Sequence, residues 1–220
     1  MLRLKVFGSL FIFLFSVSQI FATAQAPDKI IYNGKEYKLH TNPMDAYFLK
    51  FPDKKPNTGI ISSGLWRGYI ATFEIADNAL YLKDIEKLQK VEGAEKFETE
   101  MKSFFSDIVP AGKKLKVDWF TGILVLPYGK VVNYIHMGYA STYENYILLE
   151  IESGDFKKSK EFNAQEYAKF KERQYAAFRK TAEYTNLVEK MKKEKKYTDE
   201  FVDTFIKNWV VEYSSKILVD

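Results

Sequence analysis

His136, Glu144 and Asp118 are the side chains in this sequence whose types suit acid–base chemistry. Histidine changes charge near neutral pH, and a carboxylate can act as a second acid or base beside it. His136 and Glu144 belong to one loop rich in polar and aromatic residues, whereas Asp118 lies on a neighbouring predicted strand. Together they would suit a metal-independent hydrolase acting on a cell-envelope or carbohydrate substrate. The alternative is that all three make structural hydrogen bonds, because their spacing matches no catalytic motif.

Five other side chains are candidates for contacts with a ligand or partner. Arg67 falls on the apolar face of a predicted strand, so it must either pair with a carboxylate or reach solvent. It could orient an anionic ligand there, although a structural ion pair is the favoured alternative. The loop 136–145 could bind a partner, because a rigid sheet positions loop side chains while leaving them accessible. The five candidates are Trp66, Arg67, Trp119, Tyr139 and Tyr143.

Several kinds of site have no signature in the sequence. The histidines are His40 and His136, and there is no cysteine, so we expect no metal site. The motifs G-x-S-x-G, S-x-x-K, G-x-x-x-x-G-K and G-x-G-x-x-G are absent, which argues against common hydrolase, nucleotide and dinucleotide chemistry. We therefore expect no cofactor, and a non-catalytic role is favoured over an enzymatic one.

Two hairpins are predicted in the first half of the chain. The first pairs residues 29–32 with residues 35–39 across Asn33-Gly34, because both central positions of a type I′ turn need a positive φ. The second pairs residues 65–75 with residues 79–85, and its alternating apolar residues place one face in the core.

Two helices are predicted between these strands and the centre of the chain. Asn42 and Pro43 suit an N-cap and a first helical position, so a short helix is expected to follow them. A second helix is predicted over residues 95–108, where Phe, Met and Ile recur at spacings of three and four. We expect its apolar stripe to pack in the core rather than to form a ligand groove.

The central part of the chain is predicted to form an antiparallel meander. Its strands are expected at residues 117–126, 130–136 and 146–152, because these segments are rich in β-branched and aromatic residues. Residues 127–129 read Pro-Tyr-Gly and are expected to make the first turn. The loop 136–145 then connects the last two strands.

The C-terminal part, residues 160–218, is predicted to be helical. Asn163 and Glu166 suit a capping box at the start of one helix, and Thr198 suits the N-cap of the last one. The last helix carries a wide apolar stripe, which we expect to pack on the sheet. The stripe consists of Phe201, Val202, Phe205, Ile206, Trp209, Val210 and Tyr213.

Residues 1–24 are predicted to be a secretory signal peptide. Arg3 and Lys5 precede an apolar run over residues 6–21, and Ala22-Thr23-Ala24 fits the small-residue cleavage rule. A retained membrane anchor is the alternative, but the run is shorter than the roughly 20 apolar residues of a spanning helix. We therefore expect a mature chain that begins at Gln25, is periplasmic or secreted, and has no transmembrane segment.

The mature chain is expected to be close to neutral. Loss of Arg3 and Lys5 reduces the 33 basic residues by two, against 29 acidic residues. This balance argues against a nucleic-acid binder. Residues 157–196 differ, because they contain 13 basic and six acidic residues. They could attract an anionic envelope surface or an acidic partner, but a solvated helix face is favoured because the basic residues are spread around the helix.

Three phrases of the sequence resemble a group of uncharacterised bacterial exported proteins that share this core. The similarity spans residues 30–152 and implies no known activity, and the C-terminal third has no counterpart in that group. The phrases are Trp66-Arg67-Gly68-Tyr69, Trp119-Phe120-Thr121-Gly122, and Tyr134-Ile135-His136-Met137-Gly138-Tyr139 followed by Ser141, Tyr143 and Glu144.

Taken together, the sequence predicts a single α+β domain over residues 25–220. We expect a mostly antiparallel sheet of six or seven strands, one inserted helix, and two or three C-terminal helices. The leading functional hypothesis is a binding protein of the immunity or envelope-associated type that docks a macromolecular partner through the loop 136–145. The hydrolase is the runner-up. A polysaccharide-binding module is a third hypothesis, which rests on the aromatic content of 16%.

Overall fold

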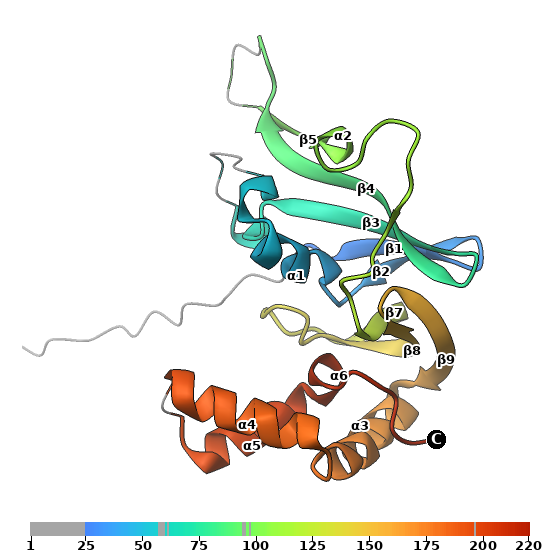
Figure 1. The fold of residues 1–220 in the computed structure, drawn as a ribbon, viewed down its shortest axis with the longest axis vertical. Helices are drawn as coiled ribbons and strands as arrows, with labels where there is room; N and C mark the ends of the chain where they lie inside the picture. Colours follow the sequence, from blue (N-terminus) through green and yellow to red (C-terminus); the bar gives the residue numbers. More distant parts are fainter. Residues whose placement is uncertain (1–24, 57–59, 61, 94–95, 97, 196) are drawn as a thin grey trace, which may run out of the picture.

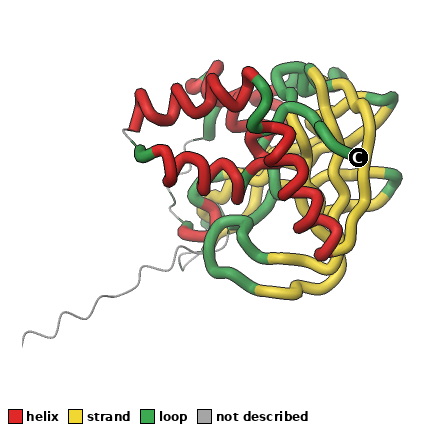
Figure 2. Tube along the Cα trace, turned by 90° about the horizontal axis from the view of Figure 1, so that it is seen from below, coloured by secondary structure: helices red, strands yellow, loops and turns green. Residues whose placement is uncertain are grey.

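The computed structural model describes residues 25–220 except 57–59, 61, 94–95, 97 and 196, so the predicted signal peptide lies outside the described residues. Strands β1–β5 lie in an upper tier, strands β7–β9 lie below them, and the C-terminal helices cover the far side of β7–β9 (Figure 1). Figure 2 shows the same helices gathered on one side of the strands. The α+β class and the mostly antiparallel sheet are confirmed, with nine strands in the described part of the chain.

The elements have the following bounds. The strands are β1 (Asp28–Tyr32), β2 (Lys35–Leu39), β3 (Tyr69–Ala76), β4 (Ala79–Lys90), β5 (Thr99–Ser103), β6 (Leu115–Lys116), β7 (Gly122–Asn133), β8 (Thr142–Glu152) and β9 (Asp155–Asn163). The helices are α1 (Pro43–Lys50), α2 (Phe105–Ile108), α3 (Ala164–Phe178), α4 (Ala182–Lys195), α5 (Asp199–Asn208) and α6 (Val210–Tyr213), and short 3-10 turns occur at Pro52–Lys54 and Ser63–Leu65.

The two predicted hairpins are present. Strands β1 and β2 pair across Asn33 and Gly34, whose φ angles of 51° and 73° are those of the expected turn. Strands β3 and β4 form the second hairpin. Strand β1 also pairs with β3 in parallel, which is an exception to the antiparallel pattern.

The sheet curls until its two outermost strands meet. Its order is β2-β1-β3-β4-β9-β8-β7, with β5 and β6 pairing with β4. The backbone N–H of His40, directly after β2, donates to the carbonyl oxygen of Val125 in β7 at 2.8 Å. The hydroxyl of Thr41 extends this contact, because it accepts from the N–H of Val125 at 3.1 Å and donates to the carbonyl of Ile123 at 3.3 Å. The inward-facing apolar side chains of both tiers therefore share one core, which includes Ile30, Tyr69, Phe73, Leu82, Ile85, Leu124, Leu126 and Leu149.

The prediction of a helix over residues 95–108 is wrong for most of this segment. Thr99–Ser103 form β5, which pairs with the far end of the long strand β4, and Leu88 lies opposite Met101. Only Phe105–Ile108 are helical. The unpaired edge of β4 explains the difference, because ladder hydrogen bonds with a neighbouring strand override the weak local preference for helix.

The predicted turn at residues 127–129 is also wrong. Strand β7 runs without interruption from Gly122 to Asn133 and pairs with β8. Gly129 has a φ of 80° and lies where the register shifts between Tyr128 and Val131, so it marks a bulge in the strand. The chain reverses only at residues 134–141, which we call the β7–β8 loop.

The C-terminal part contains a strand before its helices. Residues 155–163 form β9, so the helical region begins at residue 164 rather than at residue 160, and residues 214–218 are not helical. The predicted capping box of Asn163 and Glu166 is confirmed, as is the cap of Thr198, whose hydroxyl accepts from the N–H of Phe201. These local signals were correct because they depend on side chains three residues apart.

The apolar stripe of the last two helices divides into two rows. Val202, Ile206 and Val210 are buried in a second core cluster, together with Ile123, Val125 and Leu148 from the outward faces of β7 and β8. Packing of the stripe on the sheet is therefore confirmed for this row. The other row is only partly covered, and it consists of Phe201, Phe205, Trp209 and Tyr213.

The last residues of the chain lie back across α3 and β8. The N–H of Ile217 donates to the buried carboxylate of Glu150 at 2.7 Å. Gln174, fully buried in α3, donates to the carbonyl of Lys216 at 2.7 Å and accepts from the N–H of Leu218 at 2.9 Å. The tail thus supplies hydrogen-bond partners to two buried polar side chains, Glu150 and Gln174.

Candidate functional site

The β7–β8 loop has a defined conformation. The hydroxyl of Ser141 accepts from the N–H of Ile135 at 3.0 Å and donates to the carbonyl oxygen of the same residue at 3.1 Å. The N–H of Ala140 donates to the carbonyl of Met137 at 3.0 Å. These bonds close the loop on itself and fix the direction in which its side chains project.

Tyr139 anchors the loop to the rest of the fold. Its ring stacks on His40 with centroids 4.5 Å apart and planes 14° from parallel. Its hydroxyl donates to the side-chain oxygen of Asn42 at 3.0 Å, and the same oxygen accepts from Arg67 at 2.6 Å. Because its ring and hydroxyl already have partners, Tyr139 holds the loop in place more than it offers a free contact surface.

Arg67 lies in a buried ion pair, which is the structural alternative that the sequence favoured. It donates to the carboxylate of Asp28 at 3.0 Å and to the carbonyl of Ala26 at 3.0 Å. The second carboxylate oxygen of Asp28 accepts from the N–H of Ala71 at 2.9 Å. Burial raises the pKa of Asp28 to about 6, while the charge of Arg67 opposes this shift. Burial alone would lower the pKa of Arg67, but Asp28, with smaller contributions from Tyr139 and Tyr69, more than offsets this and raises the pKa, so the guanidinium stays charged.

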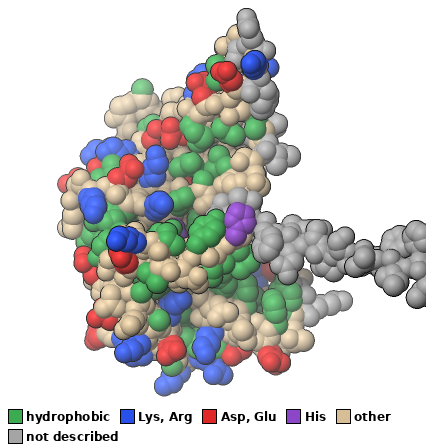
Figure 3. Space-filling view, turned by 180° about the vertical axis from the view of Figure 1, so that it is seen from behind, with side chains coloured by type: hydrophobic (Ala, Val, Ile, Leu, Met, Phe, Trp, Pro, Cys, Tyr) green, Lys and Arg blue, Asp and Glu red, His purple; other side chains and the backbone are tan. Residues whose placement is uncertain are grey.

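Exposed apolar side chains gather at the end of the β7–β8 hairpin. Val132 and Tyr134 are 61% and 62% exposed, and Met137 at the centre of the loop is 52% exposed. Val131 and Ile135 are also exposed, and Trp66 from the segment before β3 is 65% exposed. Figure 3 shows hydrophobic side chains collected in the middle of one face, beside a histidine, with charged residues towards its borders.

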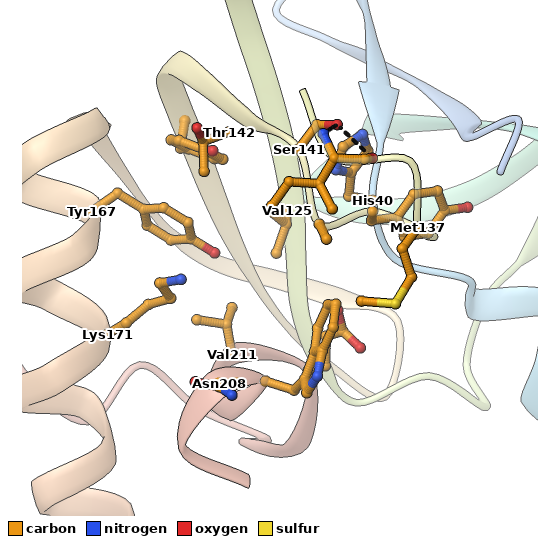
Figure 4. A pocket seen from close by; sticks show the side chains of 15 residues that line it. His40, Val125, Met137, Ser141, Thr142, Tyr167, Lys171, Asn208 and Val211 are labelled. Atoms are coloured by element: carbon orange, nitrogen blue, oxygen red, sulfur yellow. Dashed lines mark hydrogen bonds between the residues drawn. The ribbon is translucent and has the colours of Figure 1, made fainter. Parts of the chain in front are cut away.

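A cavity of about 420 Å³ lies between the β7–β8 loop and the C-terminal helices. The loop forms one wall, and side chains of β7, β8, α3, α5 and α6 form the others (Figure 4). Much of its lining is apolar or aromatic and consists of Val125, Ile135, Met137, Tyr139, Ala140, Tyr146, Trp209 and Val211. The volume falls within the usual range for small-molecule sites.

Four polar side chains of the helices line this cavity: Tyr167, Lys171, Asn208 and Glu212. Burial lowers the pKa of Lys171, an effect that the negative charge of Glu212 opposes. Glu212 is an exposed residue, but the part of its carboxylate that faces the cavity loses hydration, which raises its pKa to about 7 against the opposing charge of Lys171. The pKa of Tyr167 is also raised by burial. The cavity is therefore lined by two opposite charges, one on the half-buried Lys171 and one on the exposed Glu212.

His40 makes the stability of this region sensitive to acid. Burial, together with the charge of Lys38, lowers the pKa of His40 from 6.5 to about 4. The unfolded chain therefore binds more protons than the folded chain between these two pH values, so stability falls as the pH drops from about 6.5 to 4.

We expect His40→Phe, which preserves the stack on Tyr139, to remove this effect. The unfolding free energy of the unmodified protein should fall relative to that of the variant when the pH is lowered from 7.5 to 4.5. The difference between the two proteins should change by roughly 2–3 kcal/mol in favour of the variant. Urea unfolding at both pH values measures the difference, and comparison of the two proteins cancels the opposite contributions of Asp28 and Glu212. Parallel pH profiles for the two proteins would contradict the assignment.

The predicted acid–base residues do not come together. His136 is exposed at the loop, where its Nδ1 lies 2.9 Å from the hydroxyl of Tyr134. Glu144 accepts from the backbone N–H of Lys130 at 2.9 Å. Asp118 is exposed before the start of β7, so the whole strand separates it from His136, on the order of 35 Å at about 3.3 Å per residue.

The structure brings together three of the five predicted binding residues. Trp66, Arg67 and Tyr139 line a hollow of about 380 Å³ that adjoins the cavity and is also lined by Phe205, Trp209 and Tyr213. Tyr143 is half-buried against the edge of His40, with centroids 5.4 Å apart. Trp119 lies elsewhere, where its indole N–H donates to the carbonyl of Pro43 at 2.9 Å and its ring packs 4.7 Å from Tyr47.

Sequence reasoning missed the polar lining of the cavity. Lys171 belongs to the basic segment 157–196, which was assigned to a solvated face, and Glu212 looks like any surface acid of a helix. The one available signal was the width of the apolar stripe on the last helices. This stripe is wider than the face that can pack on the sheet, so aromatic residues such as Trp209 and Tyr213 must line another surface.

No protein-family model, no curated protein and no solved structure matches this chain. The resemblance to the group of exported proteins therefore stays a prediction. Within the described residues, no group of histidine and carboxylate side chains is arranged to hold a metal ion. No helix in that same part of the chain is long and apolar enough to cross a membrane.

Proposed function

We propose that the protein is an exported, non-catalytic binding protein that docks another protein through the β7–β8 loop, the structural counterpart of the predicted loop 136–145 whose residues 142–145 belong to β8, and through the apolar side chains beside it. The supporting observation is the group of exposed apolar residues at the end of the β7–β8 hairpin, which includes Val132, Ile135 and Met137. A contiguous apolar group of this kind marks an interaction surface more often than it occurs by chance on a monomer.

The rigidity of the loop supports the same proposal. Tyr139 is fixed by His40 and Asn42, and Asn42 is in turn bound to the buried Arg67. A surface held in one conformation loses little conformational entropy on binding, so more of the contact energy appears as affinity. Trp66 extends the surface beyond the loop, and a large exposed aromatic side chain is a typical anchor at interfaces.

The partner that fits this surface is a protein with an exposed apolar segment, located in the cell envelope or outside the cell. The hydrolase hypothesis receives no comparable support, because His136, Glu144 and Asp118 do not share a pocket in which a substrate could meet them. An immunity-type or envelope-associated role remains the class we favour.

The test uses residues 25–220 as bait against envelope and culture-supernatant fractions, followed by measurement with the purified partner. The variant Val132→Thr, Ile135→Thr, Met137→Gln should weaken a one-to-one complex by at least tenfold, because it removes apolar contacts at the centre of the proposed surface. Isothermal titration calorimetry gives the dissociation constants.

Leu49→Gln is the matched control, because Leu49 is 86% exposed but lies on α1 rather than at the β7–β8 loop. It should bind the partner as the unmodified protein does. The proposal fails if the triple variant retains full affinity while still folded by circular dichroism, or if no fraction yields a stoichiometric complex.

A further inference from the structure

We propose that the 420 Å³ cavity binds a small zwitterion with an apolar body, namely an α-amino acid with a large apolar side chain, its carboxylate at Lys171 and its ammonium group at Glu212. This inference goes beyond partner docking. The cavity shares Ile135 and Met137 with the docking surface, but the charges that would select its ligand lie on α3 and α6.

The charges of the cavity carry the argument. Lys171 and Glu212 project from different helices, and both line the same cavity. No ion pair joins them, and neither side chain has a hydrogen bond to another residue that the structure describes. Two opposite charges that line one cavity without an ion pair between them can both be paired by a molecule that places a charge of the opposite sign next to each.

The neighbouring polar groups would orient such a ligand. The amino group of Lys171 lies 5.3 Å from the ring centroid of Tyr167, and this ring is held by a stack on Tyr146 with centroids 4.0 Å apart. Figure 4 shows the Tyr167 hydroxyl directed into the cavity, with the Lys171 amino group on the same wall and Asn208 across from them. The side chains of Tyr167 and Asn208 also lack hydrogen-bond partners among the described residues, so their donors and acceptors remain available to a carboxylate or an amine.

The remaining lining fits the apolar body. Val125, Val211 and the aromatic ring of Trp209 form much of the wall, with Ile135 and Met137 contributed by the loop. The flexible thioether of Met137 can adjust to side chains of different shape. An apolar side chain would replace solvent along these walls, which is the main source of affinity in sites of this kind.

Other small molecules fit the charges less well. A simple anion would satisfy Lys171 but face the carboxylate of Glu212, and a simple cation would meet the reverse problem. An uncharged sugar or an acyl chain would leave both charges without an ionic partner. The zwitterion is the smallest ligand class that pairs both.

Calorimetric titration of the purified chain with L-phenylalanine, 3-phenylpropanoate and 2-phenylethylamine tests each charge separately. L-Phenylalanine should bind at least tenfold more tightly than either analogue, since each analogue lacks one of the two charges. Glycine, which lacks the apolar body, should bind more weakly than L-phenylalanine by a similar factor. L-Leucine, L-methionine and L-tryptophan then define the preferred side chain.

Two variants assign the charges to residues. With Lys171→Met the affinity for L-phenylalanine should fall to that for 2-phenylethylamine, and with Glu212→Gln it should fall to that for 3-phenylpropanoate. Lys169→Met, an exposed residue of the same helix, should change neither affinity. The proposal is overturned if none of the four amino acids binds at millimolar concentration, or if 3-phenylpropanoate binds as tightly as L-phenylalanine. Because no partner protein is present, these outcomes are independent of the docking experiment.

Discussion

Replacing Arg67 with methionine is expected to lower the free energy of unfolding by about 3–5 kcal/mol at pH 7.5. The substitution keeps much of the volume of the side chain but removes the charge that faces Asp28, and both residues are at most 2% exposed. The carboxylate of Asp28 would then remain buried beside the single N–H of Ala71. Urea unfolding followed by circular dichroism measures the loss.

A surface ion pair of similar length provides the matched control. Lys83 and Glu74 lie 3.2 Å apart, but their side chains are partly exposed, so Lys83→Met should change stability by less than about 1 kcal/mol. The Arg67 variant should recover part of its loss at pH 5, because an unpaired buried Asp28 takes up a proton more readily. A loss below 1 kcal/mol at pH 7.5 would mean that water can replace Arg67 at this site.

Removal of residues 216–220 should also destabilise the protein strongly, by about 3–4 kcal/mol. Ile217 is only 5% exposed and belongs to the core between β8 and the helices, and loss of a buried isoleucine typically costs about 2–5 kcal/mol. The deletion also leaves the buried amide of Gln174 without its two tail partners. Thermal and urea unfolding of the shortened chain measure the effect.

Two further variants separate the contributions of the tail. Ile217→Ala in the full chain should reproduce most of the loss of stability. Glu150 keeps its ion pair with Lys158 at 3.5 Å even in the shortened chain, so the loss of its bond to the N–H of Ile217 contributes little. Deletion of the exposed Asp220 alone should stay within about 1 kcal/mol. Equal stability of the shortened and full chains would show that the tail does not hold the helices on the sheet.

Local signals in the sequence predicted the parts of the fold that depend on neighbouring residues. The Asn33-Gly34 turn, the capping box at Asn163 and the cap at Thr198 each involve side chains within three positions, so their geometry follows from the local sequence. The segment 99–103 could not be predicted in this way. Its strand conformation depends on the free edge of β4, and sequence spacing does not show that edge.

The candidate site could also be predicted only in part. The β7–β8 loop stood out because polar and aromatic residues cluster within it, and Arg67 stood out because a charge on an apolar face needs a partner. That this partner is Asp28, 39 positions earlier, could not be predicted from the sequence. The cavity was still less accessible, because Lys171 and Glu212 belong to different helices and only the packing of these helices on β7 and β8 brings them together.

The meeting of β2 and β7 has a consequence for how the chain reaches its native state. Val125 lies 85 positions after His40, so no fragment that ends before β7 can complete the sheet. Contacts between residues so far apart close a long loop and therefore form late and slowly. We expect folding to be limited by this final closure, because the first hairpins expose apolar surface until β7 and β8 join the sheet.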